Sequence, residues 1–453
     1  MKVHFIAVGG AVMHNLALAL HKKGYTVTGS DDEIFEPALS ALTSRGLLPP
    51  EPGWHPGRIT DDIDITILGM HAKPDNPELM EAVRKGISIM SFPEYIYEET
   101  RNKRRIVVAG SHGKTTITAM IMHVFRNLGL KFDYMVGSRI EGFDTMVSLS
   151  DDSAIAVLEG DEYLTSALDR RPKFHLYMPH IAILNGIAWD HMNVFPTFDN
   201  YIEQFRILTE KIIDGGTLIY FEDDPEVKKI ALSAGSNISR RPYSVHGYFQ
   251  NREGFFGATH SRTVPLKIFG EHNMQNLSAA RETCLTAGIA EDDFYSAIES
   301  FEGASGRLQI LFENGNGVAF LDFAHSPSKV KATVEAVADR YPYSNIIACL
   351  ELHTYSSLSA GFIPLYRGTL DRAAAAFVCF SPHAFEIKKL EPLSEETVRE
   401  AFGEKGVNVF RDPSEMFRYV AGEHFKSPVY LFMSSGDFGG CDLVRTAKGL
   451  LSA

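Results

Sequence analysis

The sequence contains no apolar run of the roughly 20 residues that a helix needs to cross a bilayer, although 45% of its 453 residues are hydrophobic. Its first residues also lack the cationic flank, apolar core and small-residue cleavage site of a secretory signal. There is no excess of positive charge either, because 57 acidic residues outnumber 44 Lys and Arg and give a net charge of -13. Such a surface repels the phosphates of nucleic acids. We therefore expect a cytoplasmic protein with no membrane span and no nucleic-acid partner.

Cysteines are few and scattered. Cys284, Cys349, Cys379 and Cys441 lie far apart and form no CxxC pair. This spacing favours buried free thiols in a reducing compartment over a disulfide framework.

Repeats of the solenoid kind and low-complexity tracts are also absent, and the length predicts two to four domains. Short apolar runs alternate with longer amphipathic ones, which is the pattern of α/β proteins. The basic stretch 101–105 reads as a solvated linker, and the polar, Gly-rich stretch 303–307 interrupts the periodicity again. We therefore predict three α/β domains, spanning residues 1–104, 105–308 and 309–453.

The strongest motif follows an apolar strand at 106–109 and opens a helix predicted from Ile117 to Gly129. It consists of Gly110, Ser111, His112, Gly113, Lys114, Thr115 and Thr116. Backbone N–H groups and the partial positive charge of a helix N-terminus suit phosphate at such a place. Lys114 would neutralise the β and γ phosphates, and the Thr115 hydroxyl would bind Mg²⁺. The alternative is a glycine-rich turn with a chance Gly-Lys-Thr, but the strand before it and the helix after it favour nucleotide binding.

Polar residues follow two further strands of the same block. Three carboxylates within Glu159–Glu162 come after strand 155–158, and Asn185, Asp190 and His191 come after strand 181–184. In open parallel sheets, ligands gather outside the carboxyl ends of the strands. Glu159 and His191 would then join Thr115 as ligands of Mg²⁺ between phosphates. Taken alone, the acidic loop would read as solvated surface.

Two weaker candidates stand elsewhere. His272 and Asn276 are four residues apart on one helix face, where they could read a purine edge or serve as an exposed His and a capping Asn. The Gly9-Gly10-Ala11 turn is shaped for a nucleotide diphosphate, with Asp31 placed to accept a bond from a ribose hydroxyl. His71 and Asn76, after a later strand, are further candidates for substrate binding. The alternative is a turn that only packs the domain.

Together these residues resemble the Mur ligases, the ATP-dependent amide-forming enzymes of peptidoglycan synthesis. The family motifs occur in the family's order as Gly110–Thr115, Glu159–Glu162, Asn185 with Asp190 and His191, His272 with Asn273 and Asn276, and Asp322–Pro327. The resemblance implies a Rossmann-like first domain that binds UDP, a central P-loop ATPase-like domain and a Rossmann-like third domain. It further implies a role in cell-wall biogenesis, and hence in cell shape and division.

The resemblance also implies the ligands and their contacts. ATP and Mg²⁺ would be bound with Lys114, Glu159 and His191 as the catalytic residues, and UDP-N-acetylmuramate would be held by the first domain. His272 and Asn276 would read adenine, while Arg307, Asp322 and His325 would contact the rest of ATP. His353 and Asp437 would lie near the acceptor amine. We expect a monomer or a weak homodimer.

Within the family, the stretch from Asp161 to Pro179 looks most like the recycling branch, which joins UDP-N-acetylmuramate to L-alanyl-γ-D-glutamyl-meso-diaminopimelate. The branch that uses free L-alanine is the alternative. No Lys occurs between His191 and Lys211, although several later branches carry a carbamylated Lys there. A catalytically inactive nucleotide-binding homologue and a folate-glutamate ligase are further alternatives. The extra N-terminal unit disfavours the folate enzyme.

Overall fold

The computed structural model describes residues 1–251, 254–259, 262–403 and 405–452. Its contacts divide the chain into two compact units. The first comprises residues 1–187, 199–244 and 276–299, and the second comprises 188–198, 245–275 and 300–453. In the first unit lie a four-stranded and a seven-stranded sheet, and in the second lie a three-stranded and a six-stranded sheet. The predicted limits at 104 and 308 fall at or next to the first residues of strands β5 and β15, and the predicted α/β class is confirmed.

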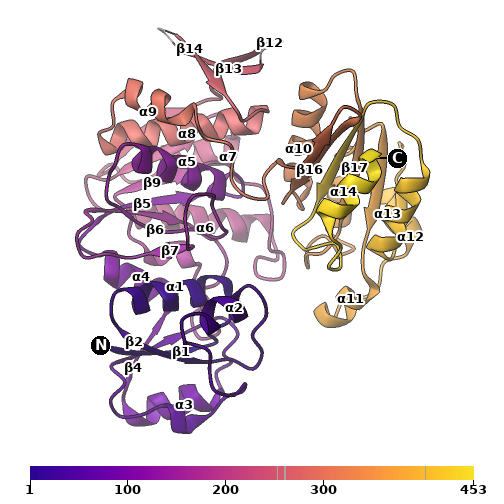
Figure 1. Ribbon diagram of the computed structural model, residues 1–453. Coiled ribbons are helices and arrows are strands. Elements are labelled where there is room, and N and C mark those ends of the chain that lie inside the picture. Colours follow the sequence, from indigo (N-terminus) through magenta and orange to yellow (C-terminus); the bar gives the residue numbers. More distant parts are fainter. Residues whose placement is uncertain (252–253, 260–261, 404, 453) are drawn as a thin grey trace. The chain divides into compact units, whose positions relative to one another are not determined.

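The four-stranded sheet has the order β2-β1-β3-β4, and all of its pairs are parallel. Its elements are β1 (Lys2–Ile6), α1 (Ala11–Lys22), β2 (Thr26–Ser30), α2 (Ala38–Thr43), η1 (Pro56–Arg58), β3 (Ile65–Leu68), α3 (Pro77–Lys85), β4 (Ser88–Ser91) and α4 (Phe92–Thr100). Helices α1 and α3 lie on opposite sides of the sheet (Figure 1). Because β1 has β2 on one side and β3 on the other, the strand order reverses at β1, where ligand crevices form in such sheets.

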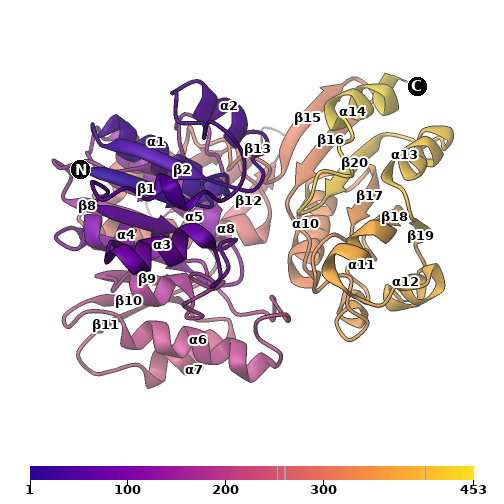
Figure 2. The ribbon, with the colours of Figure 1, turned by 90° about the horizontal axis from the view of Figure 1, so that it is seen from below.

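The seven-stranded sheet has the order β11-β10-β9-β5-β8-β6-β7 and is parallel except for the β6–β7 pair. Its strands are β5 (Arg104–Ala109), β6 (Asp133–Met135), β7 (Val147–Ser148), β8 (Ile155–Glu159), β9 (Ile181–Leu184), β10 (Thr217–Phe221) and β11 (Ser239–Tyr243). Its helices are α5 (Lys114–Asn127), η2 (Lys173–Leu176), α6 (Phe198–Glu210), α7 (Pro225–Ser233), α8 (Glu271–Ala287) and α9 (Glu291–Ile298). Figure 2 shows α6 and α7 beside β10 and β11. The order reverses at β5, which lies between β8 and β9.

The second unit contains a small antiparallel sheet and a six-stranded sheet with the order β15-β16-β20-β17-β18-β19. The small sheet is built from β12 (Tyr248–Asn251), β13 (Gly254–Ala258) and β14 (Thr263–Leu266). The larger one is built from β15 (Gln309–Asn314), β16 (Gly317–Asp322), β17 (Asn345–Glu351), β18 (Ala375–Cys379), β19 (Asn408–Phe410) and β20 (Pro428–Met433). Its helices are α10 (Pro327–Arg340), η3 (Ile363–Tyr366), α11 (Pro382–Lys388), α12 (Glu395–Ala401), α13 (Pro413–Gly422) and α14 (Leu443–Ser452).

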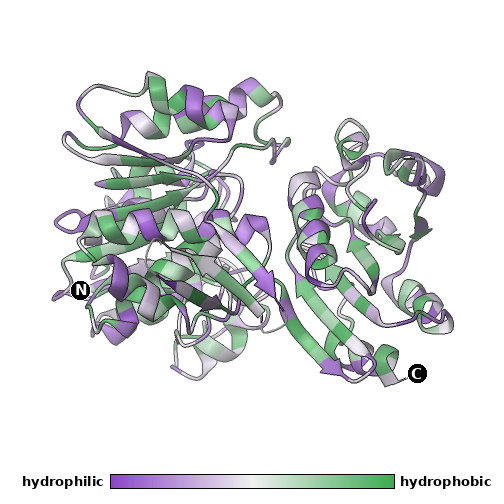
Figure 3. Cartoon of the chain, turned by 90° about the horizontal axis from the view of Figure 1, so that it is seen from above, coloured by the Kyte–Doolittle hydropathy of each residue, from purple (hydrophilic) through white to green (hydrophobic). Residues whose placement is uncertain are grey.

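Both faces of the six-stranded sheet are buried. Val318 and Phe320 of β16 join one core with α10 and α12, whereas Ala319 between them joins a second core with α13 and α14. Strands covered on both faces are apolar throughout rather than alternating. Figure 3 shows that the strands of this sheet are largely hydrophobic, whereas the surrounding helices carry both hydrophilic and hydrophobic residues.

The basic stretch 101–105 is not a solvated linker throughout, so that prediction is wrong at Arg105. Arg105 is buried in β5. Its guanidinium donates hydrogen bonds of 2.8 Å to the carbonyl oxygens of Tyr177 and Thr100. A buried guanidinium is tolerated where carbonyls meet its fixed fork of donors, and the charge pattern alone does not reveal those partners.

Three of the four thiols follow the prediction of buried free cysteines. All four cysteines are free; Cys284, Cys349 and Cys379 are buried, and Cys441 is partly exposed. Burial raises the pKa of each of the three buried thiols above its ordinary value.

Candidate active site

The predicted phosphate loop connects β5 to α5 at the point where the strand order reverses. Gly110 and Gly113 have φ angles of 126° and 70°, which favour glycine. Gly113 also has no room for a side chain, since a Cβ there would lie 2.9 Å from Asn276 Cγ and closer still to amide atoms of Asn276 and Asn185. The Asn185 amide donates to Asn276 Oδ1 at 2.9 Å, so these two predicted residues lie together under the loop. Tyr243 in turn donates its hydroxyl proton to Asn185.

Lys114 begins α5 and is held by two oxygen partners. Its Nζ lies 2.8 Å from the Gly110 carbonyl and 2.8 Å from Glu162 Oε2. Burial alone would lower the pKa of Lys114, but the carboxylates of Glu162, Asp161 and Glu159 raise it above its ordinary value. The ammonium is therefore charged at neutral pH.

Glu162 is itself fixed from the other side. Tyr201 donates its hydroxyl proton to Glu162 Oε1 at 2.9 Å, and the Tyr201 oxygen lies 3.0 Å from Ser111 Oγ. The loop residue Ser111 is thus linked through Tyr201 to the carboxylate that pairs with Lys114. A continuous buried network of this kind fixes its members more firmly than separate pairs would.

Thr115 and Glu159 form the predicted hydroxyl–carboxylate pair. The Thr115 hydroxyl donates to Glu159 Oε1 at 2.9 Å, and the Gly137 N–H donates to Glu159 Oε2 at 2.8 Å. Both side chains are buried. Because β8 lies parallel to β5, with Glu159 opposite Val108, its carboxylate comes to the start of α5. Hard oxygen donors in contact are suitable ligands for Mg²⁺.

His112 and Thr116 are the remaining residues of the motif, before and after Thr115 in the sequence. Thr116 is buried in the first turn of α5. The carbonyl of His112 accepts a 3.2 Å hydrogen bond from Asn185. His112 thus lies in the loop, and Thr116 lies in the helix that follows it.

Asp190, His191 and His325 belong to the second unit, as does Lys329, which the sequence did not single out. Asp190 Oδ2 lies 3.5 Å from Lys329 Nζ and 3.9 Å from His325 Nε2. Burial would raise the pKa of Asp190, but electrostatic interactions with Lys329, His191 and His325 lower it instead. Burial, with Lys329 adding to it, lowers the pKa of His325 to about 3. His191 adopts a left-handed φ of 54°, a strained conformation of the kind that gathers at functional sites.

Asp322 ends β16 with both carboxylate oxygens engaged. The N–H groups of Leu308 and Ala324 each donate to it at 2.7 Å. These bonds join the segment that carries Arg307 to the end of β16, and the Arg307 guanidinium lies 4.3 Å from the centre of the Phe323 ring.

His272 lies in the first turn of α8, and its Nδ1 has no hydrogen-bond partner among the described residues. Burial lowers the pKa of His272.

The predicted acceptor residues lie beside a loop that a buried carboxylate organises. Glu351, at the end of β17, accepts hydrogen bonds from the Ser434 hydroxyl and, at 3.0 Å, from the Phe438 N–H. A Cβ at Gly436 would lie 3.0 Å from both Glu351 Oε2 and the His353 ring, so His353 adjoins this loop. Asp437 is exposed in the same loop. Glu351 was not among the predicted site residues, because its role depends on β20 pairing with β17.

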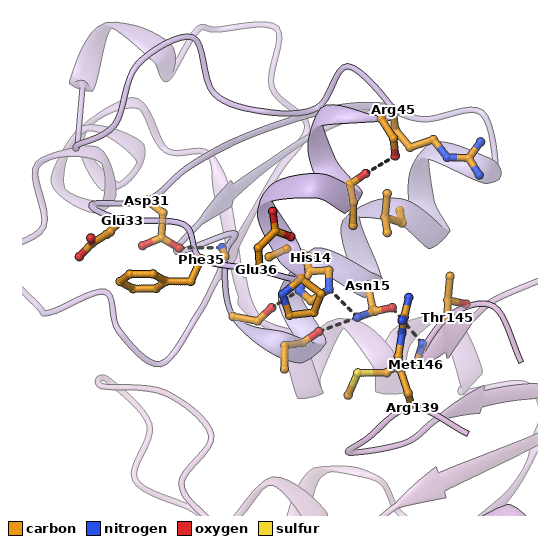
Figure 4. A pocket seen from close by; sticks show the side chains of 18 of the residues that line it. His14, Asn15, Asp31, Glu33, Phe35, Glu36, Arg45, Arg139, Thr145 and Met146 are labelled. Atoms are coloured by element: carbon orange, nitrogen blue, oxygen red, sulfur yellow. Dashed lines mark hydrogen bonds between the residues drawn. The ribbon is translucent and has the colours of Figure 1, made fainter. Parts of the chain in front are cut away.

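A cavity of about 570 Å³ opens beyond β1, between the four-stranded sheet and residues 139–146 of the same unit. Gly9, Gly10, Ala11, Asp31 and His71, all predicted as substrate-binding residues, line it. The Gly9 N–H donates to Asp31 Oδ2 at 2.6 Å (Figure 4). A Cβ at Gly9 would lie 2.9 Å from that oxygen, so glycine is what allows the backbone to approach the carboxylate.

Asn76 is not among the residues that line this cavity. It caps α3 instead, with its side chain accepting from the N–H groups of Glu78 and Leu79 at 3.0 and 3.1 Å.

Comparison with known proteins identifies the family. Residues 2–104 match the profile described as "Mur ligase family, catalytic domain", and residues 108–284 match the "Mur ligase middle domain". A UDP-N-acetylmuramate–L-alanine ligase of Chlorobium luteolum is 30% identical over 96% of this chain and 94% of its own length. The chain belongs to the Mur ligase family. It is an ATP-dependent ligase, as its relatives are.

Two further relatives of this ligase are informative. A UDP-N-acetylmuramate–L-alanyl-γ-D-glutamyl-meso-2,6-diaminoheptandioate ligase of Escherichia coli is 27% identical over 97% of this chain and 96% of its own length. The crystal structure of a murein peptide ligase from Psychrobacter arcticus covers 100% of this chain and 99% of its own, with a TM-score of 0.69 and 20% identity. At that identity the likeness establishes the multidomain Mur ligase fold.

The sequence did not reveal the far wall of the cavity of this Mur ligase. Arg139, Asp144, Thr145 and Met146 supply it, from the loop before β7. His14, Asn15 and Phe35 on the near side were also not predicted. Phe35 is 65% exposed although it lines a cavity, and this exposure follows from the folded chain and gives no signal in the sequence.

Neither a metal cluster nor a membrane helix is seen in the part of the ligase that the structure describes. No three His, Cys, Asp or Glu side chains in that part are grouped to hold an ion by themselves. No helix among the same residues is both long and apolar enough to span a bilayer.

Proposed function

We propose that this ligase joins the lactyl carboxylate of UDP-N-acetylmuramate to the amine of L-alanyl-γ-D-glutamyl-meso-diaminopimelate, with conversion of ATP to ADP and phosphate. The observation that carries the proposal is that one compact unit holds both the lysine-bearing loop after β5 and the cavity after β1. The first suits the phosphates of ATP, and the second suits a nucleotide diphosphate at a helix N-terminus.

The reaction proceeds by activation of the carboxylate and then aminolysis. A lactyl carboxylate oxygen attacks the γ-phosphorus of ATP, the bond to the β–γ bridging oxygen breaks, and an acyl phosphate and ADP form. The acceptor amine then attacks the acyl carbon, loses a proton and expels phosphate. Phosphoryl transfer of this kind needs positioning and charge neutralisation more than covalent help.

Lys114 supplies positive charge at the transferred phosphoryl group. Its contacts with the Gly110 carbonyl and Glu162 hold the ammonium beside the loop. Thr115 and Glu159, which are hydrogen-bonded to each other, would hold Mg²⁺, and the family resemblance implies His191 as a further ligand. Mg²⁺ neutralises phosphate charge when bound.

The peptide acceptor is supported by the segment from Asp161 to Pro179, the part of the sequence most like the recycling branch. Asp161 pairs with Lys173, and Asp169 pairs with Arg171 at 2.6 Å. An isolated β-bridge between Leu164 and Pro172 closes the segment into a defined loop. The name of the Escherichia coli relative supports the same acceptor. Free L-alanine is the second candidate, favoured by the name of the 30% identical relative.

The experiment is a competition between acceptors. Phosphate release is measured with UDP-N-acetylmuramate, ATP and either the tripeptide or L-alanine, using one preparation of the full chain. We expect kcat/KM for the tripeptide to exceed that for L-alanine at least a hundredfold. A preference for L-alanine would replace the recycling assignment with the biosynthetic one. ATP binding without turnover of either acceptor would indicate an inactive homologue.

A further inference from the structure

A chain of hydrogen bonds lies under the cavity and connects the glycine turn to the opposite wall (Figure 4). It begins at the Gly10 carbonyl, which lies 2.9 Å from His14 Nδ1. His14 Nε2 lies 2.9 Å from Asn15 Nδ2, and Asn15 Oδ1 accepts a 2.9 Å bond from the Met146 N–H. His14 and Asn15 are 4% and 7% exposed, so water does not compete freely for these bonds.

Only one arrangement of protons satisfies every member of the chain. The Met146 N–H can only donate, so Asn15 must present Oδ1 to it. The Ala11 carbonyl, 2.8 Å from Asn15 Nδ2, can only accept, which fixes the amide nitrogen on that side. Because Asn15 Nδ2 therefore donates to His14 Nε2, the imidazole carries its proton on Nδ1 and donates it to Gly10.

The surroundings of His14 support the neutral form that this arrangement requires. Burial lowers the pKa of His14, and the positive charge of Arg139 lowers it further, against the opposite effect of the Gly10 carbonyl. A protonated ring would direct a second N–H at the Asn15 NH₂ group. The imidazole thus selects one orientation of the Asn15 amide.

Met146 lies in the wall that faces the glycine turn, together with Arg139 and Asp144. That wall comes from the loop before β7, and Met146 is 131 positions along the chain from Asn15. A second tie between α1 and the central domain, Lys23 with Asp151 at 2.8 Å, lies at the other end of the helix. The Asn15–Met146 bond is the one at the cavity itself.

We propose that His14 and Asn15 are positioning residues for the sugar nucleotide, holding the wall of residues 139–146 at a fixed distance from the Gly9–Gly10 turn. This inference rests on the proposed function, because it assigns the cavity to UDP-N-acetylmuramate. The residues act through the geometry of the cavity and not on the reacting atoms. Their loss therefore raises KM for the sugar nucleotide and leaves kcat and the Kd for ATP unchanged.

The kinetic test uses Asn15→Ala and two substitutions of His14. For Asn15→Ala and His14→Leu, we expect KM for UDP-N-acetylmuramate to rise about tenfold, the equivalent of one buried hydrogen bond, with kcat within twofold. His14→Gln retains an acceptor for the Asn15 amide at the position of Nε2, so KM should recover to within about threefold of the wild type. Asn127→Ala is the matched control, because Asn127 donates to the carbonyl four residues earlier in its helix, as Asn15 does.

Hydrogen exchange in the ligand-free protein tests the tie independently of any substrate. In peptides that cover residues 145–149, exchange should be about tenfold faster in Asn15→Ala and unchanged in Asn127→Ala. Unchanged exchange in Asn15→Ala overturns the inference whatever the kinetics show. If the wild-type protein fails to bind UDP-N-acetylmuramate, the proposed function and the positioning role are both wrong. Faster exchange in Asn15→Ala would then show that the Asn15–Met146 bond contributes only to stability. A fall in kcat without a rise in KM would also overturn the positioning role.

Discussion

The glycine turns after β1 and β5 occupy equivalent places in their sheets but are built differently. After β5, positive φ angles fall on Gly110 and Gly113, and side chains pack directly against the loop. After β1, the positive φ falls on Ala7, at 69°, while Gly10 has a φ of -59° and the turn borders a cavity. A phosphate loop must fit closely around a small group, whereas a substrate cavity must leave room for a large one.

The charged side chains at the two turns also differ. The loop after β5 brings a lysine among three carboxylates, and the pKa of that lysine is raised. At the turn after β1 one buried carboxylate, Asp31, accepts the Gly9 N–H. Under the proposed function, the same topology serves phosphoryl transfer at the turn after β5 and binding of the sugar nucleotide at the turn after β1.

Lys114→Ala separates the two turns most sharply. Loss of the ammonium removes the charge that faces the transferred phosphoryl group, and we expect kcat to fall at least a hundredfold. The Kd for UDP-N-acetylmuramate, measured by calorimetry, should stay within twofold. Lys131→Ala is a suitable control, because Lys131 pairs with Asp152 at the surface. Near-normal ligation by Lys114→Ala would show that the loop is not the site of phosphoryl transfer.

Gly113→Ala and Gly10→Ala compare the room at the two turns. An alanine at Gly113 would meet both asparagine side chains in a left-handed conformation, so the free energy of unfolding should fall by about 3 kcal/mol. At Gly10 the nearest atom to a new Cβ is 3.5 Å away, and the change should stay within about 0.5 kcal/mol. Gly129→Ala isolates the backbone cost, about 1 kcal/mol, since its φ is 68° with nothing within 4 Å of the Cβ. Denaturant unfolding measures all three, and equal losses at Gly113 and Gly129 would contradict the packing argument.

The pH dependence of sugar-nucleotide binding tests Asp31. Burial and the neighbouring Asp32 raise the pKa of Asp31 to about 6. If the ionised carboxylate accepts the ribose hydroxyl, affinity rises with pH through 6 and levels off above 7. At pH 5 about one molecule in ten is ionised, so the Kd should be about tenfold higher than at pH 7.5. Asp31→Asn should bind weakly with a flat profile between those pH values, and a flat profile in the wild type would exclude this role.

Asn76→Ala is expected to have the smallest effect. Loss of the cap at the start of α3 should lower the free energy of unfolding by about 1 kcal/mol. KM for UDP-N-acetylmuramate should not change, because Asn76 does not line the cavity. A rise in KM at unchanged stability would restore Asn76 as a binding residue.

Local patterns were enough to predict the α/β class and the strand–loop–helix setting of Lys114, because apolar runs and glycines are properties of neighbouring residues. The meeting of Thr115 and Glu159 could be expected, since carboxyl ends of parallel strands share one edge. The pairing of Lys114 with Glu162, fixed by Tyr201, could not, because it depends on the path of the chain after β8. The cavity wall at residues 139–146 was missed for the same reason.

The burial of three of the four thiols has a practical consequence. A thiolate is the reactive form, and burial both shields the sulfur and suppresses ionisation. In the folded protein, a maleimide should therefore modify Cys441 first, and the remaining three should react only as the structure opens. Because two of the protected thiols lie in the six-stranded sheet and Cys284 lies in α8, the order in which they become labelled would report which unit unfolds first.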